Sequence, residues 1–480
     1  MFLKYFYDDA LAQASYMVAC QKTGEAAVID PSRNLKPYFD TAEQEELTIT
    51  KVFETHIHAD FVSGAKEMAE RAMATIYYSE ENGGDEFGTY QWPRHLDTVG
   101  LKDGDRIHMG NVTLEALHTP GHTPEHMSFI LTDGAASDEP IGIFTGDFLF
   151  VGDVGRPDLL EKSVGVQDSA EKGAKEMFQS LKRLKDFDPS LQIWPGHGAG
   201  SACGKSLGSI PTTTLGYEFK TNPALKPDNE ADFIAFLLAD QPTPPAYFGI
   251  MKQVNKTGAG LLAEQTTPFR YGANTKKVKH LLKQDVTVID TRSRASFAAS
   301  HIPGTLNVPY DSQFANWMGS LVSYDRDVYF IAEDHHFDGI REAMNAIGLD
   351  RTSGYFSPLV VEQYEMEEGT GDYPIISPEA AQEMHQSGEL TILDIRERYE
   401  YDTEHIEGAR HLVINDIPHT EPAAFPLRPV AVYCGSGQRS AIAASFLKEK
   451  EVDVRNIKGG FMRWKQEQRP TAQTAETAGH

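Results

Sequence analysis

Residues 55–61 read Thr-His-Ile-His-Ala-Asp-Phe, and three of their side chains can bind a metal ion. His56, His58 and Asp60 are spaced two apart and follow an apolar run that ends at Phe53. Because alternating side chains of an extended chain lie on one side, the three groups should leave the end of a strand together. The spacing therefore predicts a metal-binding loop, which needs further ligands from elsewhere in the chain.

Three later apolar runs each end in another potential ligand. They lead to His122 in Thr-Pro-Gly-His, to Asp147 in Thr-Gly-Asp and to His197 in Pro-Gly-His. The glycine before each ligand lets the backbone turn sharply where a strand ends. Ligands placed repeatedly at strand ends predict a site along one edge of a sheet. We interpret His118 and His126, which flank His122, as loop or core residues.

A second centre is expected at Cys434, which follows the apolar run Val430–Tyr433 and precedes a helix-like stretch at 441–448. Backbone N–H groups of the intervening loop can turn toward the thiol, and the start of the helix adds a positive partial charge. Such a loop stabilises a thiolate or an anionic persulfide. The loop runs from Cys434 through Gly435, Ser436, Gly437 and Gln438 to Arg439.

The length of 480 residues predicts about three domains. Residues 241–247 are Pro-rich and have the composition of a linker, but we place the end of the first, β-led domain later. An acidic stretch at 362–372 with two glycines is the predicted joint between the next two. We expect domains at residues 1–265, 266–365 and 373–469, and a disordered tail at 470–480.

An internal repeat follows the first domain and indicates two copies of one α/β fold. Three residues with equal spacing recur, namely Asp290, Arg292 and His301 in the first copy and Asp394, Arg396 and His405 in the second.

The first copy lacks the cysteine. Aligning Val328–Ile331 with Val430–Tyr433 places Ala332 opposite Cys434, and no cysteine occurs between residues 204 and 433. This copy therefore cannot carry a persulfide. We interpret it as an inactive spacer or docking surface.

Composition excludes some classes of function. A net charge of -26 argues against nucleic acid or an anionic membrane as a partner, since both require clustered Lys and Arg. No apolar run is long enough to span a membrane, and the N-terminus lacks a signal-peptide pattern, so we expect a cytoplasmic protein. The three cysteines, Cys20, Cys203 and Cys434, are too few and too distant for a disulfide framework. We interpret Cys20 as a core residue.

The motifs His-x-His-x-Asp, Pro-Gly-His, Gly-Asp and Pro-Gly-His, in this order, resemble the metallo-β-lactamase superfamily over residues 1–265. The resemblance implies an αββα sandwich. In two-metal members, the residue after the motif's aspartate is usually a histidine, whereas Phe61 cannot coordinate. With Asp60 and His197 left as a poor pair, we expect one tightly bound metal.

Within that superfamily, the segments 119–123, 152–158 and 198–206 resemble the persulfide dioxygenase branch. The resemblance implies one Fe(II) per chain. Two imidazoles and one carboxylate suit non-heme Fe(II) and leave positions open for substrate sulfur and O2. The implied ligands are His56, His122 and Asp147; His58, Asp60 and His197 are expected to orient ligands or water, or to be alternative ligands. The substrate-binding candidates are Arg156, Cys203, Lys205 and Lys220.

The loop from Cys434 to Arg439 resembles that of rhodaneses and is one residue shorter than the loop of related phosphatases. The resemblance implies that both residues are catalytic. The domain order resembles CstB-type fusions of a persulfide dioxygenase with a sulfurtransferase. It implies that a small-molecule thiol persulfide and O2 give sulfite, which a persulfide on Cys434 converts to thiosulfate. Such fusions commonly form homo-oligomers.

Two alternatives remain open. The first is a zinc-dependent thioester hydrolase resembling glyoxalase II, with separate sulfurtransferase activity. The second is a persulfide sensor without turnover. Metal content, O2 uptake and a multiple-turnover assay distinguish them.

Overall fold

The computed structural model describes residues 1–480 except 83–87, 166, 202, 206, 240 and 475–480. The chain divides into two compact units, described separately below. Unit 1 comprises residues 1–265 and 345–348, and unit 2 comprises residues 266–344 and 349–480. Among the helices of the described part of the chain, none is long and apolar enough to cross a membrane.

Unit 1 contains two six-stranded sheets. The first has the order β1-β2-β3-β4-β5-β6, and the second has the order β12-β11-β10-β9-β8-β7. The strands of the first sheet are β1 (Phe2–Asp8), β2 (Gln13–Cys20), β3 (Glu25–Ile29), β4 (Thr48–Phe53), β5 (Thr75–Ser79) and β6 (Thr98–Leu101). Those of the second sheet are β7 (Arg106–Met109), β8 (Val112–His118), β9 (Met127–Asp133), β10 (Gly142–Gly146), β11 (Gln192–Pro195) and β12 (Thr213–Thr214).

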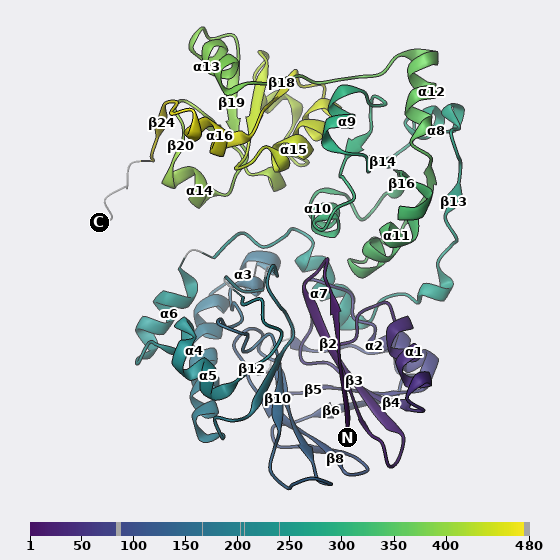
Figure 1. Cartoon of the computed structure of the whole chain (residues 1–480), viewed down its shortest axis with the longest axis vertical. Helices are drawn as coiled ribbons and strands as arrows, with labels where there is room; N and C mark the ends of the chain where they lie inside the picture. The colour runs from purple at the N-terminus through teal and green to yellow at the C-terminus, as the bar shows by residue number, and fades with distance from the viewer. Residues whose placement is uncertain (83–87, 166, 202, 206, 240, 475–480) are drawn as a thin grey trace. The chain divides into compact units, whose positions relative to one another are not determined.

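Helices cover the outer faces of both sheets. On the first sheet these are α1 (Lys36–Gln44) and α2 (Ala65–Ala72); on the second they are α4 (Ser169–Arg183), α5 (Leu215–Thr221) and α6 (Glu230–Leu238) (Figure 1). The unit also contains α3 (Leu159–Val164) and α7 (Phe248–Thr257). An apolar core including Val18, Phe53, Phe129 and Phe144 lies between the sheets. Every residue of β2 is buried, as expected for a strand covered on both faces. The predicted αββα sandwich is confirmed.

Unit 2 contains two parallel five-stranded sheets. The first copy has the order β13-β17-β16-β14-β15. Its strands are β13 (Phe269–Arg270), β14 (Val286–Asp290), β15 (Leu306–Asn307), β16 (Asp327–Ile331) and β17 (Thr352–Phe356). Its helices are α8 (Thr275–Leu281), α9 (Arg294–Ala299), α10 (Phe314–Leu321), α11 (Phe337–Ala346) and α12 (Leu359–Glu368).

The second copy repeats this topology in the order β18-β23-β22-β19-β21. Its strands are β18 (Ile375–Ile376), β19 (Thr391–Asp394), β21 (Arg410–His411), β22 (Val430–Tyr433) and β23 (Val454–Ile457), with β20 (His405–Ile406) and β24 (Thr471–Ala472) in a separate two-stranded sheet. Its helices are α13 (Pro378–Gln386), α14 (Arg398–Thr403), α15 (Gln438–Glu449) and α16 (Gly460–Gln466). The predicted repeat of α/β domains is confirmed.

The repeated residues support the fold in both copies. Arg292 binds the Asp290 carboxylate and donates to the Ser300 carbonyl at 2.8 Å. Arg396 binds Asp394 and the Glu404 carbonyl in the same way. His301 and His405 each stack on the aromatic ring four residues earlier. These residues fix the turn after the first long strand of each copy.

The C-terminal tail departs from the expectation of disorder from residue 470. Thr471–Ala472 form β24, which pairs with β20 (His405–Ile406), and Trp464 Nε1 donates to the Pro470 carbonyl at 2.9 Å. The backbone pairing and the indole bond hold this part of the tail. Residues 475–480 of the expected tail lie outside the described residues.

Candidate metal centre and cysteine loop

Three predicted ligands from three loops meet in unit 1. His56 follows β4, His122 follows β8 and Asp147 follows β10. All three are buried, and each offers a ligand atom within 4.8 Å of the others. Asp147 Oδ2 lies 3.8 Å from His56 Nε2 and 3.6 Å from His122 Nε2. His56 Nε2 and Asp147 Oδ2 are buried without a hydrogen-bond partner, as ligands directed at a metal ion would be. We call these residues the metal trio.

Contacts behind the trio fix each ligand. Thr55 Oγ1 lies 2.9 Å from His56 Nδ1 and donates to Asp30. His122 Nδ1 donates to the Arg156 carbonyl at 2.9 Å. The Asp147 backbone N–H donates to His126 Nε2 at 3.1 Å. Each contact leaves the ligand atom facing the centre of the trio, as outer groups do in metal sites.

The ionisation states suit cation binding. Burial lowers the pKa of His122 to about 4 and places the pKa of His56 well below its ordinary value. Burial also disfavours the ionised form of Asp147, but the charge and hydrogen bond of His197 outweigh it and lower the Asp147 pKa. The trio therefore offers two neutral imidazoles and one carboxylate, the protonation states that metal binding requires.

A second buried trio lies beside the first. Asp60, His197 and Cys203 offer ligand atoms within 4.8 Å of one another, and we call them the Cys203 trio. His197 Nδ1 is 2.6 Å from Asp147 Oδ1, and His197 Nε2 is 2.6 Å from Asp60 Oδ2. The expectation that Asp60 and His197 are left as a poor metal-binding pair stays a prediction, although Cys203 lies beside them. Cys203 completes the set because the segment after β11 turns back to the site.

His58 points away from the metal trio. Its Nε2 lies 3.2 Å from Asp30 Oδ1 and 3.6 Å from Glu54 Oε2, and all three residues are buried. Burial disfavours the charged imidazole, but the charge and hydrogen bond of Asp30 outweigh it and raise the His58 pKa to about 9. His58 therefore holds the ligand loop through an ionic network.

Phe61 is buried between the ligands. Its ring centroid lies 4.4 Å from that of His58 and 6.5 Å from that of His197, and Asn255 Nδ2 donates to its carbonyl. The ring fills the space beside the Cys203 trio with apolar atoms.

The four substrate-binding candidates fall in different environments. Arg156 is fully buried, and its guanidinium binds Asp158 and the Pro242 carbonyl. A substrate-binding role of Arg156 stays a prediction, and its guanidinium is engaged in the core. Cys203 is also buried, and burial together with the charges of Asp60 and Asp147 raises its thiol pKa.

The two lysines are exposed. Lys205 Nζ donates to the Phe236 carbonyl at 2.9 Å, and the Lys220 carbonyl accepts from Lys226. Substrate binding by these lysines stays a prediction.

Cys434 lies at the carboxyl end of β22 in unit 2 and is 1% exposed. We call residues 434–439 the cysteine loop. The Gly437 N–H donates to Cys434 Sγ at 3.2 Å, and Gly437 has a φ of 92°, which favours glycine. Ser436 and Gln438 are exposed, whereas Gly435 is half-buried. The loop ends directly at the start of α15, so the positive end of this helix lies next to the thiol.

The start of α16 supports the loop. Phe461 N–H donates to the Cys434 carbonyl at 2.7 Å, and Met462 N–H donates to the Gly435 carbonyl at 2.9 Å. A Cβ atom at Gly460 would lie 2.3 Å from the Cys434 carbonyl oxygen, so only glycine allows this approach.

Arg439 forms a bidentate ion pair with Glu400. Its Nη1 and Nη2 atoms donate to the two carboxylate oxygens at 2.9 Å each. Burial disfavours both charges, but the pair outweighs it, so the pKa of Arg439 is raised and that of Glu400 is lowered. The side chain of Arg439 is 27% exposed and that of Glu400 is 21% exposed. The pair therefore lies at the surface beside the thiol.

The corresponding loop of the first copy has no thiol. Register pairs Asp290 with Ile331, as it pairs Asp394 with Tyr433, so the next residues, Ala332 and Cys434, are equivalent. Asp334 of this loop binds Arg270 through two hydrogen bonds at 2.7 and 2.6 Å.

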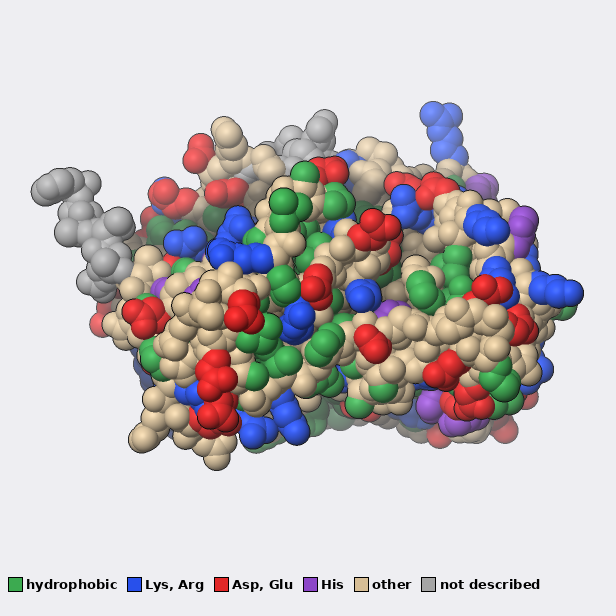
Figure 2. Space-filling model, turned by 90° about the horizontal axis from the view of Figure 1, so that it is seen from above, with side chains coloured by type: hydrophobic (Ala, Val, Ile, Leu, Met, Phe, Trp, Pro, Cys, Tyr) green, Lys and Arg blue, Asp and Glu red, His purple; other side chains and the backbone are tan. Residues whose placement is uncertain are grey.

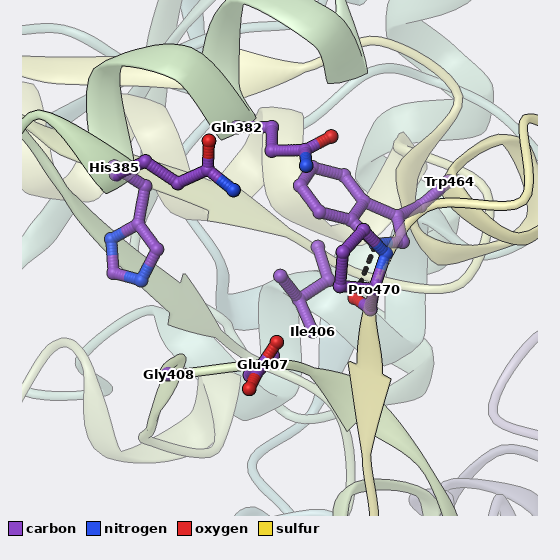
Figure 3. A pocket seen from close by; sticks show the side chains of 8 residues that line it. Gln382, His385, Ile406, Glu407, Gly408, Trp464 and Pro470 are labelled. Carbon is purple, nitrogen blue, oxygen red and sulfur yellow. Dashed lines mark hydrogen bonds between the residues drawn. The ribbon is translucent and has the colours of Figure 1, made fainter.

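A pocket of about 250 Å³ in the second copy opens between α13 and β20 (Figure 3). No residue of the cysteine loop lines this pocket. The lining residues are Gln382, His385, Gln386, Ile406, Glu407, Gly408, Trp464 and Pro470.

Acidic and basic side chains are interspersed over the face shown in Figure 2. The absence of a nucleic-acid partner stays a prediction.

Several residues that position the ligands and Arg439 have no clear signal in the sequence. His126 was interpreted as structural, but it holds the Asp147 backbone. Asp30 and Thr55 carry no ligand pattern of their own, but Thr55 donates to Asp30 through its backbone N–H and its hydroxyl. Glu400 carries no motif signal and emerges only from the fold.

The fold and the site together define a metal-dependent αββα domain followed by a thiol-bearing α/β tandem. Residues 8–197 match the metallo-beta-lactamase superfamily, and residues 274–358 and 377–467 match the rhodanese-like domain.

A metallo-beta-lactamase structure from Staphylococcus aureus is 45% identical, with 74% of this chain and 99% of that chain covered and a TM-score of 0.66. The chain thus belongs to the metallo-β-lactamase superfamily, with two rhodanese-like domains after the metal domain.

Curated relatives match the first domain. A hydroxyacylglutathione hydrolase from Rhodospirillum rubrum is 29% identical over 241 residues, covering 49% of this chain and 77% of the relative. A probable polyketide biosynthesis zinc-dependent hydrolase, PksB, from Bacillus subtilis is 28% identical over 193 residues, covering 40% of this chain and 76% of the relative.

Proposed function

We propose that the chain is a cytoplasmic persulfide dioxygenase joined to a sulfurtransferase. The observation that carries the proposal is the presence, in one chain, of a two-imidazole, one-carboxylate centre and a buried cysteine in a short rhodanese-type loop. The sulfite released at the first centre would be the acceptor for the sulfur atom carried by the second, which gives a reason for one chain to contain both. We also propose that the protein forms a homo-oligomer.

His56, His122 and Asp147 would hold Fe(II), because their unpartnered buried atoms and neutral imidazoles fit such an ion. When bound, Fe(II) would supply open positions for the persulfide sulfur and O2 and the electrons that activate O2. The overall reaction balances: one thiol persulfide, one O2 and one water give one thiol, one sulfite and two protons.

The chain's own residues set the conditions for this step. Thr55 and the Arg156 carbonyl hold the imidazoles of His56 and His122 in fixed orientations, and His126 holds the backbone of Asp147. His197 contacts Asp147 through Nδ1 and keeps that carboxylate ionised. Phe61 excludes water from one side of the site.

The second step takes place at Cys434. The Cys434 thiolate attacks the outer sulfur of a thiol persulfide, a new S–S bond forms, the S–S bond of the donor breaks, and the donor leaves as its thiol, so that Cys434 carries the persulfide Cys434–S–S⁻. The lone pair of the sulfite sulfur attacks the outer sulfur, a new S–S bond forms, and the old S–S bond breaks with its electron pair returning to Cys434 Sγ. The Gly437 N–H and the start of α15 stabilise the thiolate that leaves.

A second candidate function is a zinc-dependent thioester hydrolase in the first domain. The hydroxyacylglutathione hydrolase relatives favour it, as does the Cys203 trio, whose donors could complete a second metal site. The two candidates differ in metal identity, metal count and O2 consumption.

Metal analysis of protein purified without air, coupled to O2 uptake with several thiol persulfides, tests the proposal. We expect about one iron per chain and persulfide-dependent O2 uptake. Two zinc ions per chain with thioester hydrolysis and no O2 uptake would establish the hydrolase instead.

Separate variants then test the two centres. Cys434→Ala should keep O2 uptake and change the product from thiosulfate to sulfite. Asp147→Ala should lose metal and O2 uptake but keep thiosulfate-to-cyanide sulfur transfer. If both activities disappear in a folded variant, the two-centre model fails.

A further inference from the structure

The chemistry of the Cys434 thiol does not by itself require an ion pair between Glu400 and Arg439. Arg439 is the second residue of α15 and its guanidinium lies over the cysteine loop, where a Cβ atom at Gly435 would be 3.6 Å from Nη2. Glu400, from α14, occupies both Nη atoms at 2.9 Å. The guanidinium beside the cysteine loop is therefore held by a carboxylate.

The first copy provides an internal comparison. The helices α9 and α14 start at equivalent positions, so Ser296 corresponds to Glu400. Counting from Ala332 in the same way, Phe337 corresponds to Arg439. The copy without the cysteine thus also lacks the glutamate and the arginine.

The residues that both copies keep have a different role. Asp290 and Arg292 repeat the contacts of Asp394 and Arg396. These contacts stabilise the fold, since they persist where no thiol exists. The cysteine, the arginine and the glutamate behave as one functional set.

Helix capping does not account for the charge of Glu400. Glu400 does accept the Glu397 N–H at 3.1 Å in a capping box. In the first copy, Ser293 accepts the Ser296 N–H at 3.1 Å and starts the equivalent helix without a carboxylate. Glutamine serves as well as glutamate in a capping box. The negative charge is explained by Arg439 instead.

We propose that Glu400 is a positioning and specificity residue that holds Arg439 at the mouth of the cysteine loop and balances its charge. An unbalanced guanidinium in this half-buried place would retain dianions through charge-assisted hydrogen bonds. The balanced pair lets sulfite and thiosulfate enter and leave. This inference rests on the proposed sulfur transfer at Cys434.

The test is thiosulfate-to-cyanide transfer by the full-length protein, which does not need the metal trio. In Glu400→Gln, the cap is kept and the charge is lost. We expect the KM for thiosulfate and the inhibition constant for sulfite to fall about three- to tenfold, and kcat to fall because sulfite leaves more slowly. The kcat/KM for cyanide, which is mostly uncharged HCN near neutral pH, should not change.

Three variants serve as controls. Glu400→Asp keeps the charge and should restore the thiosulfate KM. Glu407→Gln removes one charge from an exposed position of the same domain and should have no effect. In an Arg439→Gln background, Glu400→Gln should no longer lower the KM.

Three outcomes would overturn the inference. One is a lower kcat with an unchanged KM in Glu400→Gln, which indicates a structural role. Another is an equal fall of the KM in the Arg439→Gln background, which indicates direct repulsion of the anion. Absence of transfer by the wild-type protein would overturn both the inference and the proposed function, whereas the first two results leave the proposed function intact.

Discussion

At the scale of single residues, the metal domain depends on what lies beside each ligand. Phe61 follows the motif aspartate and is 1% exposed between His58 and His197. The Cys203 trio offers three further donors beside it. Because the ring of Phe61 adds no fourth donor there, we expect one metal ion per chain rather than two.

We expect Phe61→His to raise metal occupancy from about one toward two ions per chain, because the imidazole adds a donor to the Cys203 trio. Burial of the polar ring should lower the free energy of unfolding of the metal-free protein by about 1–3 kcal/mol. Elemental analysis and denaturant unfolding measure the two effects.

Phe61→Leu is the matched control, since it alters packing without adding a ligand. Two metal ions per chain in the unmodified protein would mean that Phe61 does not limit occupancy.

Arg156 illustrates a motif residue whose side chain is structural. Because its guanidinium binds Asp158 in the core, Arg156→Ala leaves this buried carboxylate with Lys162 as its remaining ion-pair partner and should lower the free energy of unfolding by about 1–3 kcal/mol. Lys205→Ala, at an exposed position, should cost little stability. Thermal unfolding of both variants checks this; a stable Arg156→Ala protein with a raised persulfide KM would support the substrate-binding role.

At the scale of elements, the positions of the strand ends determine which site residues could be predicted from the sequence. The ligands were predictable because each follows an apolar run that ends a strand. The expectation of a single sheet edge is wrong, because His56 follows a strand of the first sheet whereas His122 and Asp147 follow strands of the second. The repeat also predicted the α/β copies. The positions of Cys203 and Glu400 were not predictable, because each depends on a segment that folds back by tertiary contacts rather than by local pattern.

The turn between β23 and α16 should be as important as the cysteine loop itself. Gly460→Ala brings a Cβ atom within 2.3 Å of the Cys434 carbonyl oxygen at a φ of 57°. We expect loss of sulfur transfer of at least tenfold and a destabilisation of about 1–3 kcal/mol, with O2 uptake unchanged.

Gly388→Ala is the control for this turn. It has a φ of 82° but meets no atom within 4 Å, so it adds backbone strain without a clash. Equal sulfur-transfer losses in both variants would show that strain, not displacement of the loop, is responsible.

At the scale of the whole molecule, the covalent link between the centres should matter. Sulfite formed by one domain is the acceptor for the other, so a tether raises its local encounter frequency without a sealed channel. We expect the intact protein at low concentration to release less free sulfite than an equimolar mixture of the Cys434→Ala and Asp147→Ala proteins. Timed assays of sulfite and thiosulfate make the comparison; identical product ratios would show that the tether contributes nothing.

The packing inside unit 2 has a consequence for the protection of the thiol. Eight consecutive residues of α15, Ser440–Leu447, are buried, and the Asn307 N–H of the first copy donates to Ser445 Oγ at 3.0 Å. Phe297 and Leu321 of the first copy share one apolar cluster with Cys434 and Ile442. Local unfolding of the first copy would therefore expose α15, the helix that follows the cysteine loop. We therefore expect unfolding of the first copy to make the Cys434 thiol more accessible to oxidants.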